Sequence, residues 1–124
     1  MTLETTVTKA KRSYVKPTAV PAAELSLALQ TKALCDWKLQ TWSDDCGKTE
    51  ALEANFKFKN FPAAIAFMSG LVDFCEELQH HPAWTNDHNR LRISLTTNSI
   101  DKKISAYDLT LAKEISNRFG AIAG

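Results

Sequence analysis

The chain has 124 residues, of which 44% are apolar and 23% charged, and its 15 basic residues are offset by 14 acidic ones. This length and composition predict one globular domain. The net charge of +1, with acidic and basic residues interleaved, argues against the clustered Lys and Arg surface that direct nucleic-acid binding needs. No apolar run approaches the roughly 18 residues of a membrane span, so we expect no membrane partner either.

Residues 1–20 differ from the rest of the chain in composition. They are rich in threonine and lysine and contain one acidic residue, which predicts a flexible tail ahead of a single domain at residues 21–124. The three cysteines include no CxxC pair, so we expect free thiols, each a small buried side chain, in the reducing cytoplasm. The alternative is that the basic tail directs the protein to an organelle.

The first half of the domain is predicted to be a helix followed by a hairpin. Pro21 can open a helix, and leucine and alanine then recur at helical spacing through about Leu34. The segment 37–42 is strand-like, and residues 43–48 have the composition of a turn. Apolar and polar residues alternate over 52–59, which is typical of a strand with one buried face.

The second half is predicted to be helix, strand and helix. Asn60 can cap a helix that Pro82 ends. The apolar stripe of this helix comprises Ile65, Met68, Leu71, Val72, Cys75 and Leu78. Residues 91–97 alternate as a strand, a polar connection follows over 98–104, and Ser105-x-x-Asp108 has the spacing of a capping box before the last helix.

This order of elements predicts an α+β fold in which helices cover one face of a small sheet. The sheet has too few strands to close into a barrel, so its edges stay open and favour pairing with a second subunit. We expect the core to contain the large aromatic residues, namely Trp37, Trp42 and the six phenylalanines.

Two adjacent histidines stand where the long helix ends. Pro82 keeps His81 out of the helical conformation, and only such irregular backbone lets His80 and His81 share a site. An imidazole has an unperturbed pKa of about 6.5, so the pair can supply a proton donor and a proton acceptor near neutral pH. One alternative is that both rings only bind the free carbonyls of the helix end. Another is a zinc site with His88, although the spacing is unusual for zinc.

Three further groups can complete such a site. Asp108 is expected on the buried face of the last helix, where an imidazole is a natural partner for a carboxylate. Glu76 precedes His80 by one helical turn and could orient it. The segment Thr96-Thr97-Asn98-Ser99 can hydrogen-bond a flat polar heterocycle. The alternatives are that Asp108 only caps its helix and that the Thr and Asn residues only form a turn.

Part of the sequence, EELQHHPAWTNDHNRLRISLTTNS followed by SAYDLTLAKEI, resembles the pterin-4a-carbinolamine dehydratase family. The positions that match the family pattern are Glu76, His80, His81, Pro82, His88 and Asp108. The stretch NFKFKNFPAAIAFM also resembles the hairpin strand and following helix of the family, and the likeness extends from about Leu25 to Phe119.

The resemblance implies a four-stranded antiparallel sheet with helices packed on one face, usually in a homodimer or homotetramer. It implies an enzyme that removes water from 4a-hydroxytetrahydropterin to give quinonoid dihydropterin, which recycles tetrahydrobiopterin for the aromatic amino acid hydroxylases. It implies a pterin substrate and neither a metal nor an organic cofactor.

The resemblance also assigns roles to residues. His80 and His81 are the catalytic acid and base, in an order left open, and Asp108 maintains the protonation state of the site. The expected substrate-binding residues are Glu76, Gln79, Pro82, Thr96, Thr97, Asn98 and Ser99.

Asn98 departs from the family pattern, because the family has its third active-site histidine at this position. Asparagine keeps a hydrogen-bond donor and an acceptor but cannot titrate. The alternative function is therefore a weak or inactive member of the family. Such a member would act as a pterin-binding protein, for example in molybdopterin assembly, or as a dimerisation cofactor for a transcription factor.

Overall fold

The computed structural model describes residues 15–45 and 47–123. Its helices are α2 (Ala22–Leu29), α3 (Phe61–Leu78) and α4 (Ala106–Ala123), its short 3-10 helices are η1 (Lys32–Leu34) and η2 (Asn98–Ile100), and its strands are β1 (Lys38–Asp44), β2 (Gly47–Lys57), β3 (Ala83–Asp87) and β4 (Arg90–Leu95). None of these helices combines the length and the hydrophobicity needed to cross a bilayer.

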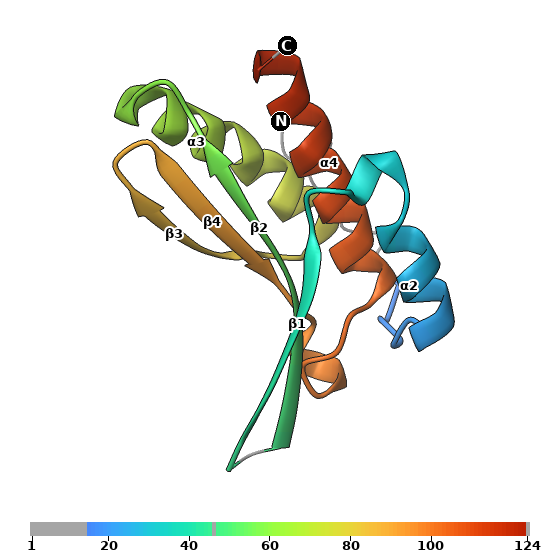
Figure 1. The fold of residues 1–124 in the computed structure, drawn as a ribbon. Helices are drawn as coiled ribbons and strands as arrows, with labels where there is room; N and C mark the ends of the chain where they lie inside the picture. The colour runs from blue at the N-terminus through green and yellow to red at the C-terminus, as the bar shows by residue number, and fades with distance from the viewer. Residues whose placement is uncertain (1–14, 46, 124) are drawn as a thin grey trace, which may run out of the picture.

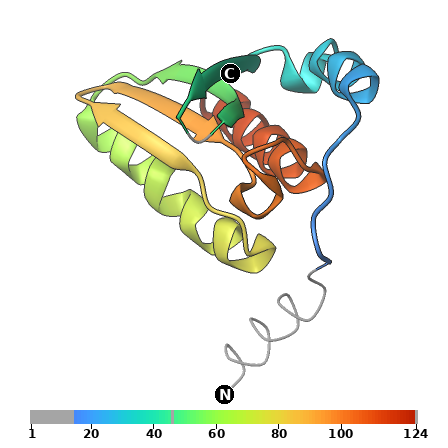
Figure 2. The same cartoon turned by 90° about the horizontal axis from the view of Figure 1, so that it is seen from below.

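The strands form one antiparallel sheet in the order β1-β2-β4-β3. Figure 1 shows α3 and α4 on the same face of this sheet. In Figure 2 the sheet and these two helices form separate layers, with α2 set at one end. The predicted α+β class and the four-stranded sheet are confirmed.

Two elements differ from the residue-based predictions. The first helix ends at Leu29 instead of Leu34, because Thr31 takes an extended conformation before η1 begins. The strand β3 has no counterpart among the predicted elements. Its inward-facing residues are Trp84 and Asn86, so a single apolar side chain carried the period-two signal and the alternation was too weak to detect.

The core lies between the sheet and the helices α3 and α4. Leu52, Ala54 and Phe56 of β2 are each at most 4% exposed, as the alternation predicts. Ring packing links the sheet to both helices, with centroids 4.8 to 6.3 Å apart among Phe56, Phe58, Phe67 and Phe119. Because burying one such side chain contributes about 1.5–3 kcal/mol, this cluster holds the helices against the sheet.

Several side chains expected in the interior lie at the surface. Trp42 is 45% exposed, because the β1–β2 hairpin extends beyond the helices that cover the sheet (Figure 1). Phe61, the first residue of α3, is 47% exposed. Cys75 is buried as expected, but Cys35 is exposed, and Cys46 lies outside the described residues.

The apolar residues of α3 occupy two neighbouring faces of the helix, so the prediction of one buried stripe is wrong. The core-facing set is Ala64, Phe67, Leu71 and Cys75. Ile65 and Val72, predicted in the same stripe, are 37% and 50% exposed. Only one face of a helix can meet the sheet, which leaves the second apolar face in contact with solvent.

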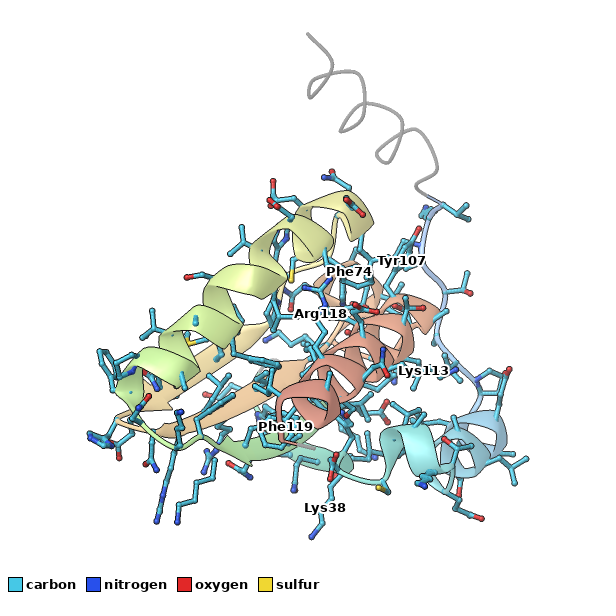
Figure 3. The ribbon with its side chains drawn as sticks, turned by 90° about the horizontal axis from the view of Figure 1, so that it is seen from above. Lys38, Phe74, Tyr107, Lys113, Arg118 and Phe119 are labelled. Carbon is cyan, nitrogen blue, oxygen red and sulfur yellow. The ribbon has the colours of Figure 1, made fainter. Side chains whose placement is uncertain are left out.

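Arg118 of α4 fixes α4 against α3. Its guanidinium donates a 2.6 Å hydrogen bond to the carbonyl of Gly70 and another to Glu114, and it lies 5.5 Å from the ring centre of Phe74. Figure 3 shows Arg118 and Phe74 between the two helices. This contact holds the second half of α3 beside the second half of α4.

Residues 15–20, which composition assigned to the tail, lie against the loop before α4. The N–H of Val20 donates to the carbonyl of Ile104 at 2.8 Å, and Ala19 forms an isolated β-bridge with Ser105. Pro17 is buried. Residues 1–14, the rest of the predicted tail, lie outside the described part of the chain.

Candidate active site

The end of α3 fixes the position of His80. Gln79 has a left-handed conformation with φ 57° and ends the helix. The N–H of Gln79 donates to the carbonyl of Glu76, and the N–H of His80 donates to the carbonyl of Cys75 at 3.1 Å. These two bonds make a Schellman cap, which satisfies the free carbonyls with backbone N–H groups. The cap therefore leaves the imidazole of His80 free for another partner.

The start of α4 fixes the position of Asp108. Its Oδ2 accepts the N–H of Ser105 at 2.9 Å, and the Ser105 hydroxyl accepts the N–H of Tyr107 at 3.2 Å. This reciprocal pairing is a capping box, as predicted. Asp108 is 0% exposed, so its carboxylate needs hydrogen bonds to offset the loss of water.

A buried network joins His80 to Asp108. The Nε2–H of His80 donates to Asp108 Oδ1 at 2.5 Å, and the Thr97 hydroxyl donates to Asp108 Oδ2 at 2.7 Å. The Ser105 hydroxyl lies 2.7 Å from that of Thr97. An ionised carboxylate only accepts hydrogen bonds, so the proton on His80 faces Asp108 and the second ring nitrogen, Nδ1, is left for another partner. Asp108 is thus both a helix cap and the partner of an imidazole.

His81 has a different carboxylate partner. Its Nε2 lies 2.6 Å from Glu76 Oε2, and the two side chains are 60% and 52% exposed. The prediction that Glu76 orients His80 is therefore wrong. It assumed that the helical register continues to residue 80, but the left-handed Gln79 ends the helix and turns His80 toward α4.

The remaining predicted binding residues lie in two settings. Thr97 is buried and its hydroxyl donates a hydrogen bond to the carboxylate of Asp108, whereas Asn98 and Ser99 are exposed in η2. Thr96 is half-buried and its hydroxyl approaches the carbonyl of Lys103 at 3.5 Å.

Gln79 and Pro82 flank the two histidines. Gln79 is exposed and donates through its side-chain amide to the last turn of α3 at 3.0 Å, and Pro82 is half-buried. The alternative of a zinc site has no ligand set, because no three His, Cys, Asp or Glu side chains in the described residues are arranged to hold a metal ion.

Tyr107 contacts the site and was not predicted. Its ring stacks on His80 with centroids 5.9 Å apart and an interplanar angle of 30°. Its hydroxyl accepts the N–H of Val15 at 2.7 Å and donates to the carbonyl of the same residue. Figure 3 shows Tyr107 at the start of α4, beside the N-terminal segment. Nothing in the sequence distinguishes this tyrosine from an exposed residue in the first turn of a helix.

Comparison with known proteins identifies the family. The family model described as pterin 4 alpha carbinolamine dehydratase matches residues 18–118. The chain belongs to this family. Pterin-4-alpha-carbinolamine dehydratases from Brucella ovis and Brucella canis, whose names assign the activity provisionally, are 36% identical over 86 residues, which is 69% of this chain and 82% of theirs.

A solved structure shares the fold of this dehydratase family member. It is the crystal structure of a protein from Brucella melitensis, described as a transcriptional coactivator/pterin dehydratase. The two chains are 33% identical with a TM-score of 0.67, and the match covers 86% of this chain and 100% of the other. The resemblance first found in the histidine segment therefore extends to the three-dimensional structure.

Proposed function

We propose that the protein removes water from 4a-hydroxytetrahydropterin to give quinonoid dihydropterin. The observation that carries the proposal is the His80–Asp108 pair, which is almost fully buried at 2.5 Å in a chain of the dehydratase family. A buried hydrogen bond between an imidazole and a carboxylate that also accepts a hydroxyl donor is an arrangement that holds the imidazole in one orientation and one tautomer.

The reaction needs two proton transfers. A base removes the proton from N5 of the pterin, and an acid protonates the 4a-hydroxyl so that it leaves as water. His80 suits the base, because its proton on Nε2 is held by Asp108 and its Nδ1 can accept another. Asp108 would then stabilise the imidazolium that forms. His81 suits the acid, because its exposure lets it recover a proton from water.

The residues around the pair would hold the pterin. Asn98 and Ser99 in η2 offer exposed polar groups for the edge of the ring, and Gln79 and Pro82 border the histidines. Thr97 acts through Asp108 and is a positioning residue. Asn98 can bind the ring but cannot exchange a proton, so we expect turnover to rise when Asn98→His restores an imidazole.

The direct test is the decay of 4a-hydroxytetrahydropterin, followed by its absorbance. We expect the protein to accelerate this decay. His80→Ala should lower the catalysed rate by about 10²–10⁴-fold, which is the usual contribution of one acid–base group. His88→Asn is a matched control, because His88 has a left-handed backbone in the β3–β4 turn that asparagine tolerates. If the substrate decays as fast with His80→Ala as with the wild-type protein, the proposal is wrong.

One observation favours a second role as an interaction module. The exposed face of α3 carries Phe61, Ile65 and Val72, with Met68 half-buried between them. The spacing of these residues is that of an apolar helix face that docks against another helix. We propose that this α3 face binds a second copy of the chain and builds a homodimer or homotetramer.

The association can be tested separately from the activity. We expect the double variant Ile65→Glu and Val72→Glu to lower the molar mass measured by light scattering while the fold is kept, because both side chains are exposed. A wild-type protein that is monomeric would rule out self-association. A transcription-factor helix bound at the same face would replace the second copy as the occupant.

A further inference from the structure

A polar hollow of about 520 Å³ lies between the start of β2 and the loop that follows β4. Six of its lining residues carry the polar groups, namely Lys48, Thr49, Asn98, Asp101, Lys102 and Lys103. Three lysines and one aspartate therefore line the same hollow in a chain whose net charge is only +1. Such a concentration of positive charge attracts an anion.

The loop that carries two of these lysines is held on both sides. The carbonyl of Lys102 accepts the N–H of Glu50 in β2 at 2.9 Å. The carbonyl of Lys103 accepts the N–H of Thr97 at 3.0 Å, just after the end of β4. The backbone of both lysines is thereby fixed relative to the sheet, so their side chains start from defined positions at the hollow.

The same loop has an unusual backbone. Asp101 and Lys102 are consecutive residues with φ of 61° and 59°, in the left-handed region that glycine adopts at no steric cost and that other residues rarely enter. Strain of this kind persists mainly at functional sites. Glycine would relieve the strain at both positions, which makes the side chains of Asp101 and Lys102 candidates for a functional role.

The hollow adjoins the proposed pterin site. Asn98 lines the hollow, and its neighbour Thr97 bonds to Asp108, the partner of His80. In this arrangement a pterin held by Asn98 has N5 and C4a toward His80, and its side chain, which starts at the neighbouring C6, extends toward the three lysines. The ring itself offers no anionic group to pair with them, so a group on the side chain must do so.

Resting on the proposed function, we propose that the substrate is a reduced pterin whose side chain ends in an anionic group. Lys48, Lys102 and Lys103 bind that group, and a phosphate ester fits three ammonium donors better than a single carboxylate does. The three lysines are thus specificity residues, and the chemistry at His80 is unchanged.

The test compares two pterins that differ only in charge. One carries a trihydroxypropyl side chain, and the other carries the same side chain with a phosphate on its terminal hydroxyl. We expect the phosphorylated pterin to bind the full-length protein on the order of tenfold more tightly at low salt, and this advantage to shrink as salt screens the charges. A third pterin with a carboxylate-ended side chain shows whether phosphate or any anion is preferred.

Variants locate the effect. Lys48→Gln and Lys102→Gly should each lower the affinity for the phosphorylated pterin severalfold and leave that for the neutral pterin unchanged. Lys102→Gly also relieves the left-handed backbone, so loss of folding would not explain its effect. Lys113→Ala is the matched control, because Lys113 is an exposed lysine on α4 (Figure 3) and does not line the hollow.

Each outcome decides the proposal. Equal affinity for the charged and neutral pterins overturns the inference, and turnover of the neutral pterin would show that the proposed function still stands. Inorganic phosphate that binds as tightly as the phosphorylated pterin would reveal only an anion site and overturn it too. If neither pterin binds or reacts, the proposed function fails and the inference falls with it.

Discussion

The two adjacent histidines lie in opposite surroundings. The side chain of His80 is 11% exposed and pairs with the carboxylate of Asp108, which is 0% exposed. The side chain of His81 is 60% exposed and pairs with the carboxylate of Glu76, which is 52% exposed. Breaking a buried pair leaves an uncompensated charge, while an exposed pair contributes about 0–1 kcal/mol. The comparison shows that neighbours of the same type acquire different roles from the elements that receive them, α4 for His80 and α3 for His81.

The largest effect is expected at Asp108. Asp108→Ala should lower the free energy of unfolding by about 3–5 kcal/mol, because it leaves the His80 Nε2–H and the Thr97 hydroxyl without their acceptor and removes a helix cap. Asp108→Asn keeps the shape, but its amide can donate to His80 and favour the wrong tautomer, so we expect a rate loss of about 10²–10⁴-fold. Urea unfolding and the pterin decay rate measure both effects.

Asp73→Asn is the control for Asp108, because it removes the same charge from an exposed position on α3. It should change neither quantity. An Asp108→Asn protein with the wild-type rate would show that the buried carboxylate serves only the fold.

The next effect is expected at Tyr107, which covers the ring of His80. Tyr107→Leu removes the stacked ring, and an aromatic contact of this kind contributes about 0.5–1.5 kcal/mol, so kcat should fall up to about tenfold with KM nearly unchanged. Tyr107→Phe keeps the ring and loses the hydroxyl, which bonds to Val15, so its kcat should lie close to that of the wild type. Equal losses in both variants would assign the effect to the N-terminal segment instead of the ring.

A smaller effect is expected at Glu76, on the exposed side of the comparison. Glu76→Gln should change the free energy of unfolding by less than about 0.5 kcal/mol, because water and salt already screen the pair with His81. The decay rate should fall by less than the loss in Asp108→Asn. If the two variants lost equal activity, the distinction between a buried and an exposed imidazole would disappear.

The smallest effect is expected in the reactivity of two thiols, because Cys75 is buried and Cys35 is exposed, a contrast like that between His80 and His81. Burial raises the pKa of the Cys75 thiol, and the nearby charge of Arg118 only partly offsets this. The thiol therefore stays protonated at neutral pH, and alkylation followed by peptide mapping should modify the exposed Cys35 well before Cys75. Rapid labelling of Cys75 in the native protein would mean that the end of α3 opens easily.

Local patterns in the sequence were sufficient for part of the site. The spacing of Ser105 and Asp108 predicted the capping box, and the placement of Asp108 on the buried face predicted an imidazole partner; both are confirmed. Pairings that depend on the path of the chain after a helix end were not predictable. Gln79 takes a left-handed conformation without being glycine, so no residue type at the helix end indicated that Glu76 would meet His81.

Tertiary contacts explain the other differences. The strand β3 is specified by its pairing with β4 more than by its own residues, since Trp84 is its one apolar inward side chain. Trp42 and Val72 are residue types typical of a core, but within residues 15–45 and 47–123 no second layer covers them. Burial at such positions depends on the length of neighbouring elements, which hydrophobic periodicity does not encode.

The position of the proton on His80 tests the central claim most directly. Nitrogen-15 NMR of the imidazole distinguishes the two ring nitrogens, and the bond to Asp108 predicts a protonated Nε2 and an unprotonated Nδ1 in the neutral ring. Binding of a stable reduced pterin should then shift the Nδ1 signal. A proton found on Nδ1 instead, or an Nδ1 signal that does not shift when the pterin binds, would contradict the assignment of His80 as the base.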